Sequence, residues 1–256
     1  MSDLFWLSDA QMARLERFFP KSHGKPRVDD RRVLSGIIFI NRNGLRWRDA
    51  PKEYGPHKTL YNRWKRWSDK GIFAQILVGL AADHGEEKTV MIDATYLKAH
   101  RTASSLRAKK GGPGDKRGRV IGRTKGGMNT KLHAICDSRG RPLNLFITAG
   151  QISDYVGARA LCSSLPTVGW LLGDRGYDAD WFREALEDKG IKACIPGRKQ
   201  RKTPVKYDKR RYKRRNQIEI MFGRLKDWRR VATRYDRSPT VFLSAIALAA
   251  LVIFWL

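Results

Sequence analysis

The amino-acid sequence predicts a mixed α/β sheet flanked by helices and preceded by a small all-helical domain. Three observations carry this prediction. Residues 1–75 repeat their apolar side chains at helical spacing. From Lys88 onward, short apolar segments rich in β-branched residues alternate with amphipathic segments. Hydrophobic residues make up 41% of the chain and include eight Trp, which is enough apolar material for one or two folded domains.

The excess of Lys and Arg in the sequence indicates a negatively charged partner. The 256 residues include 52 Lys plus Arg against 25 Asp plus Glu, a formal net charge of +27. Because so many cations repel one another unless a polyanion is present, nucleic acid is the first candidate and a membrane surface the second. The three Cys and five His show no CxxC, HxH or HExxH spacing, which argues against zinc sites and disulfides and indicates a reducing compartment. The N-terminus does not have the pattern of a signal peptide.

Three helices are expected in residues 1–75. Their sequences are DAQMARLERFF, RRVLSGIIFINRNGL and HKTLYNRWKRWSDKG, with a short element and turn, LRWRDAPKEYGP, before the last. The last helix places Leu60, Tyr61, Trp64 and Trp67 on one face and Asn62, Arg63, Lys65 and Arg66 mostly on the other. This arrangement resembles a helix-turn-helix, so we expect Arg63, Lys65 and Arg66 to contact DNA. A solvated basic face over a Trp-rich core is the alternative.

The rest of the chain predicts the sheet, beginning with a central strand in KTVMIDATYLK. Residues 101–128 hold nine Lys or Arg and seven Gly and are expected to form a flexible basic loop. A hairpin over 131–148, a helix in YVGARALCSSL, a strand in TVGWLLGD, a helix in DADWFREALEDKG and a strand in IKACIP follow. A second basic loop, GRKQRKTPVKYD, leads into a long helix over 212–230. This order gives an antiparallel meander followed by right-handed crossovers, with helices on both faces.

The C-terminal segment predicts an apolar helix at 239–256. Ser238 and Pro239 match an N-cap followed by Pro at the first helical position. The apolar run of residues 241–256 is shorter than the roughly 20 residues that a membrane span needs. We therefore expect a helix that is buried in the core or packed against a partner, with a membrane span as the alternative.

Two acidic residues occupy positions where open α/β sheets build sites. Asp93 lies inside the first strand among apolar neighbours, where a carboxylate is costly unless a charged group meets it. Asp174 follows a buried strand, at the end where ligands gather in such sheets. Asp93 could instead be the buried partner of an Arg, and Asp174 could be a helix cap or a turn residue.

One face of the long helix carries four polar residues of mixed charge. Tyr212, Arg215, Glu219 and Lys226 fall within an arc of about 60° at 100° per residue. The alternative for this pattern is a simple surface pair of Arg215 with Glu219, four positions apart.

These residues carry a resemblance to a known family. The pattern Y-x2-R-x3-E-x6-K at 212–226 resembles the signature of insertion-sequence transposases of the DDE, ribonuclease H-like class. MIDAT-Y around Asp93, GRTKGGMNTKLHA at 122–134 and LLGDRGYDAD around Asp174 are similar to the insertion-sequence-five family, as is RRVLSGIIFINRNGLRWRDAP in the N-terminal region. The resemblance implies a ribonuclease H-like fold and a catalytic triad of Asp93, Asp174 and Glu219.

The resemblance also implies how the site works. Two divalent ions, Mg²⁺ or Mn²⁺, would stabilise the attacking and leaving oxygens at a DNA phosphodiester, with Asp93 bridging both ions and Asp174 and Glu219 holding one each. Arg215 and Lys226 would hold phosphates, and Tyr212 would pack against a sugar or base. Arg123 and Lys125, in the basic segment before the hairpin, are further candidates for DNA contact. Asp154 is a candidate extra participant, whereas Asp137 is expected in a hairpin turn and Asp178 and Asp180 as helix caps.

We therefore expect a DNA transposase that cleaves the ends of a bacterial insertion sequence and joins the 3′ ends to target DNA. Residues 1–75 would bind the terminal inverted repeats, and residues 86–256 would form the catalytic domain. Double-stranded DNA is the expected partner, with a homodimer or larger assembly on it and no membrane, in the cytoplasm at the bacterial nucleoid. The alternatives are a DNA-binding repressor derived from a transposase and a metal-dependent nuclease without strand transfer.

Overall fold

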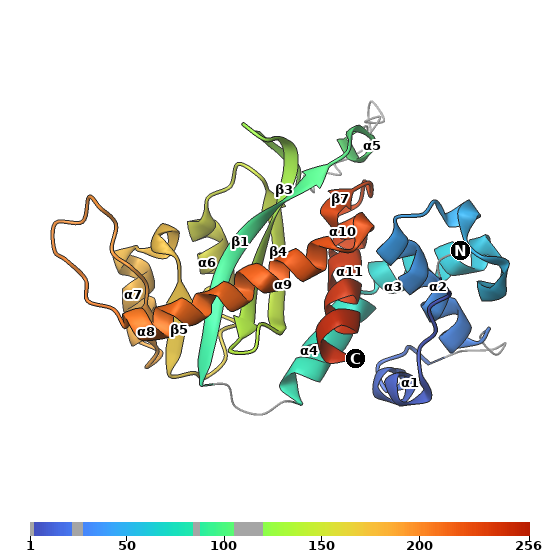
Figure 1. Cartoon of the computed structure of the whole chain (residues 1–256), viewed down its shortest axis with the longest axis horizontal. Helices are drawn as coiled ribbons and strands as arrows, with labels where there is room; N and C mark the ends of the chain where they lie inside the picture. Colours follow the sequence, from blue (N-terminus) through green and yellow to red (C-terminus); the bar gives the residue numbers. More distant parts are fainter. Residues whose placement is uncertain (1–2, 22–27, 84–87, 105–119) are drawn as a thin grey trace.

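A seven-stranded mixed sheet forms the centre of the molecule (Figure 1). The structure is a computed structural model and describes residues 3–21, 28–83, 88–104 and 120–256. The strands follow one another in the order β2-β3-β1-β5-β6, with β4 paired to β3 and β7 paired to β1. They are β1 (Thr89–Ala99), β2 (Gly122–Thr124), β3 (Gly127–Asp137), β4 (Pro142–Ala149), β5 (Trp170–Gly173), β6 (Lys192–Cys194) and β7 (Thr233–Arg234).

Strand β1 occupies the middle of this sheet, as the sequence predicts. It runs antiparallel to β3 and parallel to β5. The hairpin β3–β4 is antiparallel and β5–β6 is parallel, so the meander and the crossovers are both present. The predicted fold class, a mixed α/β sheet, is therefore confirmed. Two-residue β7 was not expected, because so short a segment has no measurable period.

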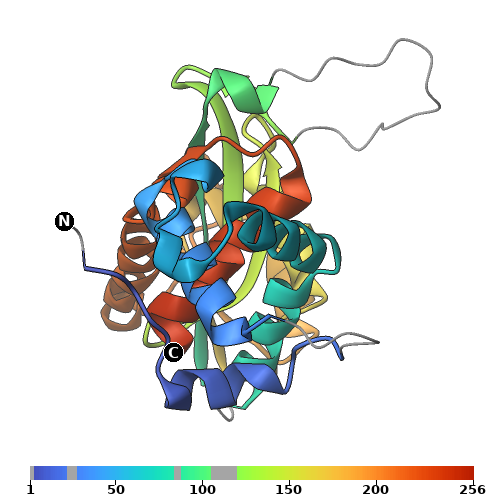
Figure 2. The same ribbon diagram turned by 90° about the vertical axis from the view of Figure 1, so that its right-hand side faces the viewer.

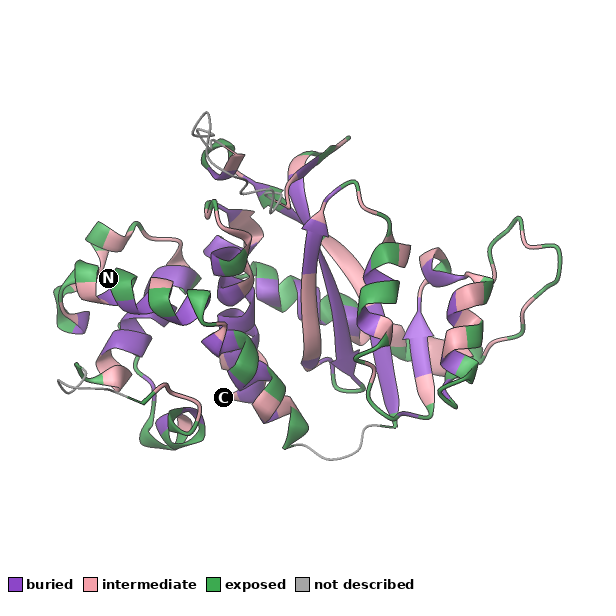
Figure 3. Cartoon of the chain, turned by 180° about the vertical axis from the view of Figure 1, so that it is seen from behind, coloured by how far each residue is buried: buried purple, intermediate pink, exposed green. Residues whose placement is uncertain are grey.

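Helices cover both faces of the sheet (Figures 1 and 3). On one face α6 (Asp154–Cys162) and α7 (Asp180–Glu187) bury a core with the side chains of Val90 and Ile92. On the other face α9 (Asn216–Lys226) packs with Met91 and Leu97 of β1. Since alternate residues of a strand point to opposite faces, Asp93 and Thr95 lie on the side of α9.

The N-terminal helices join the same core as the α9 face of the sheet. They are α1 (Asp9–Glu16), α2 (Asp30–Asn43), α3 (His57–Asp69) and α4 (Ile72–Ala82), with the 3₁₀ turns η1 (Trp47–Asp49) and η2 (Lys52–Tyr54) between α2 and α3. Gly44 ends α2 in the left-handed conformation, φ 70°, as the Asn-Gly signal indicates. Helix α4 was not predicted from the sequence, and the domain boundary expected at residue 75 falls inside it. Apolar α4 shows no clear amphipathic period because it packs against both α11 and β4.

The C-terminal segment is a core helix, α11 (Pro239–Ala250), which continues as a π-helical turn at Leu251–Trp255. The Ser238 side chain accepts a hydrogen bond from the Val241 N–H, and Pro239 begins the helix. Figure 2 shows α11, in red, behind the N-terminal helices, and it contacts α2, α3, α4 and β4. None of the helices in the described ranges is long and apolar enough to cross a bilayer.

Two predicted segments differ from the structure. The loop expected at 101–128 contains α5 (Arg101–Ser104), β2 and the start of β3, while residues 105–119 lie outside the described part of the chain. The helix expected over 212–230 is divided into α8 (Lys209–Tyr212), the 3₁₀ turn η4 (Lys213–Arg215), α9 and α10 (Arg229–Ala232). The break follows Asp227, where Trp228 adopts an extended backbone and is buried in the core. Burying this indole redirects the chain, an effect of packing that local periodicity does not contain.

Candidate functional site

Asp93 and Asp174 are neighbours because of the register of two parallel strands. Ile92 of β1 pairs with Gly173, the last residue of β5, so the next residue of each strand is an aspartate. Adjacent strands lie about 4.8 Å apart. Asp174 leaves the sheet at this point and caps the short turn η3 (Arg175–Tyr177), where its Oδ1 accepts a hydrogen bond from Gly176 N at 2.8 Å. Both carboxylates therefore lie at the carboxyl end of β5.

Glu219 comes to the same place on the helix that crosses β1. Arg215 Nη1 donates to Asp93 Oδ2 at 2.8 Å, and Arg215 Nη2 donates to Glu219 Oε1. The guanidinium thus bridges a strand carboxylate and a helix carboxylate that are 126 positions apart in the sequence. The two simple alternatives, a buried Asp93–Arg pair and an Arg215–Glu219 pair, are both present. Together they link Glu219 to Asp93 through one guanidinium.

The charges at this site are not balanced. Burial raises the pKa of Asp93 above its ordinary value, the nearby Asp174 raises it further, and Arg215 opposes the shift. Burial lowers the pKa of Arg215, but its pairing with Asp93 outweighs this effect and leaves the pKa raised. Two carboxylates about 4 Å apart repel by roughly 4 kcal/mol at an effective dielectric constant near 20. One guanidinium serving two of the three carboxylates leaves a net negative site.

The other two residues of the predicted helix face, Lys226 and Tyr212, have different neighbours. Lys226 Nζ donates to Thr95 Oγ1 at 2.7 Å, two residues along the strand from Asp93. The ring of Tyr212 packs edge-on against Tyr207 and lies 6.0 Å from the Arg215 guanidinium. Thr95 was not predicted as a site residue, although its position two residues after Asp93 on a strand places it on the same face.

The carboxylates suit a hard divalent cation. Within the part of the chain that the structure describes, no three His, Cys, Asp or Glu side chains lie close enough together to hold one metal ion. The Arg215 guanidinium lies between Asp93 and Glu219 and donates to both. The donor set itself fits, since carboxylate oxygens are the ligands that Mg²⁺ and Mn²⁺ prefer. Burial raises the pKa of Asp93, and the neighbouring Asp174 adds to this rise, so a cation beside Asp93 would favour its charged form. The Glu219 side chain is 58% exposed, so solvent leaves room for other side-chain conformations once its pairing with Arg215 is released.

Tyr177, a buried residue near these acids, was not predicted as a site residue. Burial raises the pKa of its phenol, and the charges of Asp154, Asp93 and Asp174 raise it further. Among the described residues its buried hydroxyl has no hydrogen-bond partner. The spacing from Asp174, three residues on in DRGY, is the only signal that the sequence offers.

The other acidic residues considered for the site pair with cations or with backbone N–H groups. Asp137 accepts from Arg139 N, Arg141 N and Arg141 Nε in the β3–β4 turn, as expected. Asp154 begins α6 and accepts from Lys131 Nζ at 3.0 Å.

The expected capping roles of Asp178 and Asp180 are wrong. Ala179 is the N-cap of α7 and offers no side-chain cap. Asp178 is buried and accepts from Arg183 Nε, Arg201 Nη1 and Arg198 N. Asp180, the first residue of α7, pairs with Arg201. Both acids therefore anchor the second basic loop to α7.

Of the cations expected to contact DNA, one is buried and the others lie at or near the surface. Arg63 is not on the expected DNA-facing surface: its side chain is 5% exposed, pairs with Asp30 and lies over the Trp67 ring. Asp30 neutralises the Arg63 charge from 33 positions away in the sequence, and helical periodicity does not reveal a partner at that distance. Lys65 pairs with Asp69 at 2.6 Å and Arg66 is exposed. Arg123, on edge strand β2, and Lys125, in the following turn, are both exposed.

Comparison with known proteins identifies the family. The profile of the family described as “Transposase DDE domain” matches residues 84–255, and that of “Putative transposase of IS4/5 family” matches residues 7–77. The chain is similar to “Putative transposase for insertion sequence element IS6501” of Brucella ovis, with 40% identity over 50% of this chain and 99% of that relative. It is also similar to the IS402 counterpart of Burkholderia cepacia, with 27% identity over 52% of this chain and 70% of that relative.

A solved structure shows the same fold. The cryo-EM structure of the piggyBac transposase synaptic complex with hairpin DNA aligns with a TM-score of 0.53 at 8% identity, over 94% of this chain and 69% of that one. The predicted ribonuclease H-like fold and the predicted resemblance to insertion-sequence transposases are thereby confirmed. Because the first profile spans more than half of its length, the chain belongs to the family of transposases with a DDE domain.

Proposed function

We propose that this transposase binds the terminal inverted repeats of an insertion sequence, cleaves the element ends and joins their 3′ ends to target DNA. The observation that carries the proposal is the convergence of Asp93, Asp174 and Glu219 from β1, β5 and α9. We assign these three residues as the catalytic triad. Transposases of the DDE class use divalent metal ions, and the oxygen-rich, net negative site supports the same requirement here.

We propose Mg²⁺ or Mn²⁺, two ions per site, with Asp93 shared and Asp174 and Glu219 each holding one. When bound, the ions would stabilise the attacking and leaving oxygens of the phosphodiester. Arg215 would then release Glu219 and, with Lys226, hold DNA phosphates beside the scissile bond, while Tyr212 packs against a sugar or base. Arg215 and Lys226 reach β1 from α9, so phosphates held there would lie beside the carboxylates.

The DNA surface extends beyond the acids in this proposal. Residues 1–75 would bind the terminal repeats, and residues 86–256 would form the catalytic domain. The proposed phosphate contacts outside the acids are Lys65, Arg66, Arg123 and Lys125. Arg63 is not among them, because its side chain is buried and paired with Asp30. Two element ends would require a homodimer or a larger assembly on DNA, working in the bacterial cytoplasm at the nucleoid. Because α11 packs against α2, α3 and α4, surface substitutions rather than a deletion should test the N-terminal region.

The triad is tested with isosteric variants of the full chain. Asp93→Asn, Asp174→Asn and Glu219→Gln should each abolish Mg²⁺-dependent nicking of a labelled element end and retain binding of that DNA in a gel-shift assay. Asp227→Asn is the matched control, since Asp227 is exposed and directly follows α9. Normal nicking by any triad variant would remove that residue from the assignment. Nicking without joined product in the parent would favour the nuclease alternative, and binding without nicking would favour the repressor.

A further inference from the structure

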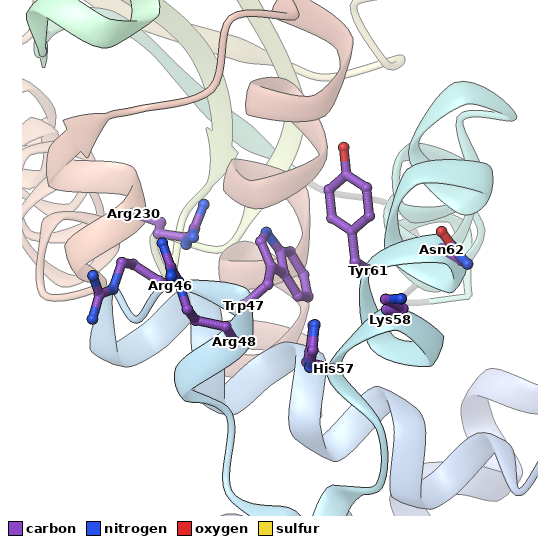
Figure 4. A pocket seen from close by; sticks show the side chains of 8 residues that line it. All are labelled: Arg46, Trp47, Arg48, His57, Lys58, Tyr61, Asn62 and Arg230. Atoms are coloured by element: carbon purple, nitrogen blue, oxygen red, sulfur yellow. The ribbon is translucent and has the colours of Figure 1, made fainter.

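A second concave site lies away from the three acids, between the N-terminal helices and α10. Figure 4 shows this pocket, which has a volume of about 560 Å³. That volume lies in the range of pockets that hold small ligands. Three separate segments build it: the turn η1, the first turns of α3, and α10 from the catalytic region. Its lining residues are Arg46, Trp47, Arg48, His57, Lys58, Tyr61, Asn62 and Arg230.

Aromatic rings form one wall of the pocket. Trp47 meets Tyr61 edge to face at a centroid distance of 5.6 Å, and the Arg230 guanidinium lies 5.5 Å from the Trp47 ring on its other side (Figure 4). Arg230 is held there by its own hydrogen bond from Nη2 to Leu45 O, at 2.7 Å. This hydrogen bond helps to keep the Arg230 guanidinium beside the Trp47 ring. Tyr61, which the sequence analysis placed on the apolar face of its helix, is instead 44% exposed.

Cations form the rest of the pocket, and none of its lining residues is acidic. Arg46 pairs with Asp49 at 2.6 Å, and Arg230 lies 3.6 Å from Asp236. Within the described residues no acidic partner is found for Arg48 or Lys58, and both are exposed. Helix α3 also begins here, at His57, without a side-chain cap or an acidic residue in its first turn. Two cations that have no acidic partner among the described residues, beside the exposed ring of Tyr61 and the half-buried ring of Trp47, are suited to an anion that carries a flat ring.

We propose that this pocket binds a single unpaired nucleotide of DNA, with its base against Tyr61 and Trp47 and its phosphate on Arg48 and Lys58. The inference rests on the proposed function, since it presumes that the chain binds DNA. Stacking platforms combined with cations are how proteins hold bases that have left the duplex. A fully paired duplex would present phosphates to the cations but no base face to the rings. Arg230 lies on α10, the helix that directly follows α9 in the chain, so consecutive helices contribute to the two sites.

The test measures binding in EDTA, so that cleavage plays no part. The probes are a labelled duplex with one unpaired thymidine and the same duplex with an abasic unit at that position. The full-length parent should bind the first about tenfold more tightly, because base–aromatic stacking is worth that order of affinity. Tyr61→Ala should remove this preference without changing affinity for the abasic duplex, and Tyr61→Phe should keep it. Tyr235→Ala is the matched control, since Tyr235 is 45% exposed and does not line the pocket.

The cations are tested through the salt dependence of binding. Arg48→Ala with Lys58→Ala should weaken binding of both probes and lower the slope of log affinity against log salt by about 2. Arg14→Ala with Lys70→Ala removes two exposed cations that do not line the pocket and serves as the control. Equal binding of the two probes by the parent, or an unchanged preference in Tyr61→Ala, would overturn the inference while leaving triad-dependent nicking intact. Failure to bind either probe would overturn the proposed function as well.

Discussion

The ion pair between Arg215 and Asp93 allows a stability prediction whose size and pH dependence both follow from the site. The two side chains are 16% and 18% exposed and meet at 2.8 Å. Removing one partner of a fully buried pair costs about 3–5 kcal/mol, because the other charge is left uncompensated. Allowing for the residual exposure, we expect Arg215→Met to lower the free energy of unfolding by about 2–3 kcal/mol near pH 8. For a chain of this size that corresponds to a melting temperature lower by about 5–10 °C.

The loss should depend on pH in a defined direction. Burial raises the pKa of Asp93 above its ordinary value of 3.8, and Arg215 opposes that shift. A carboxyl group whose pKa rises on folding stabilises the folded state when the pH is below the ordinary pKa. This stabilisation is lost as the pH increases through the raised pKa. Without Arg215 the pKa of Asp93 should rise further. The stability difference between variant and parent should therefore be larger at about pH 8 than at about pH 4.

Urea unfolding followed by circular dichroism at both pH values would measure this effect. Arg214→Met removes an exposed neighbouring guanidinium and should change stability by less than about 0.5 kcal/mol. A double-mutant cycle with Asp93→Asn isolates the pair and should give a coupling energy of about 1–3 kcal/mol. A coupling energy near zero, or an equal loss at both pH values, would refute the assignment of this pair as the source of the stability.

Three other predictions follow from the same structure. Arg234 is fully buried and donates hydrogen bonds to Val120 O, Thr130 Oγ1, Asp236 O and Arg237 O. Arg234→Ala should therefore lower the free energy of unfolding in urea by about 3–5 kcal/mol. Arg234→Lys should not restore the loss, because Lys lacks the planar fork of donors. Tyr177→Phe should leave stability unchanged or raise it by up to about 1 kcal/mol, since the buried hydroxyl that it removes has no hydrogen-bond partner among the described residues; a loss above about 1 kcal/mol would reveal one. Mg²⁺ should raise the melting temperature of the parent and not that of Asp93→Asn, with EDTA reversing the gain; an equal rise in both would place the ion elsewhere.

Local patterns in the sequence predicted the parts of the site that each element carries by itself. The apolar, β-branched run around Asp93 and the short apolar run before Asp174 identified both strands, and the helical spacing put Arg215, Glu219 and Lys226 on one face. These predictions hold because the periods of 2 and 3.6 residues are properties of the local backbone. The carboxylates stood out for the same reason, since an acid in a buried strand needs a charged partner.

Long-range packing decided the rest. Nothing within a few residues of Arg63 indicates that Asp30 will bury and neutralise it, or that Trp228 will enter the core and end α9. The pocket joins residues 46–62 to Arg230, and the β1–β5 register sets Asp93 beside Asp174. The sequence by itself determined the elements, their polarity and the acids available for chemistry. Only the tertiary structure decided which charges meet, because partners distant in the chain are chosen by how apolar faces pack and by which strands align, and local periodicity carries neither.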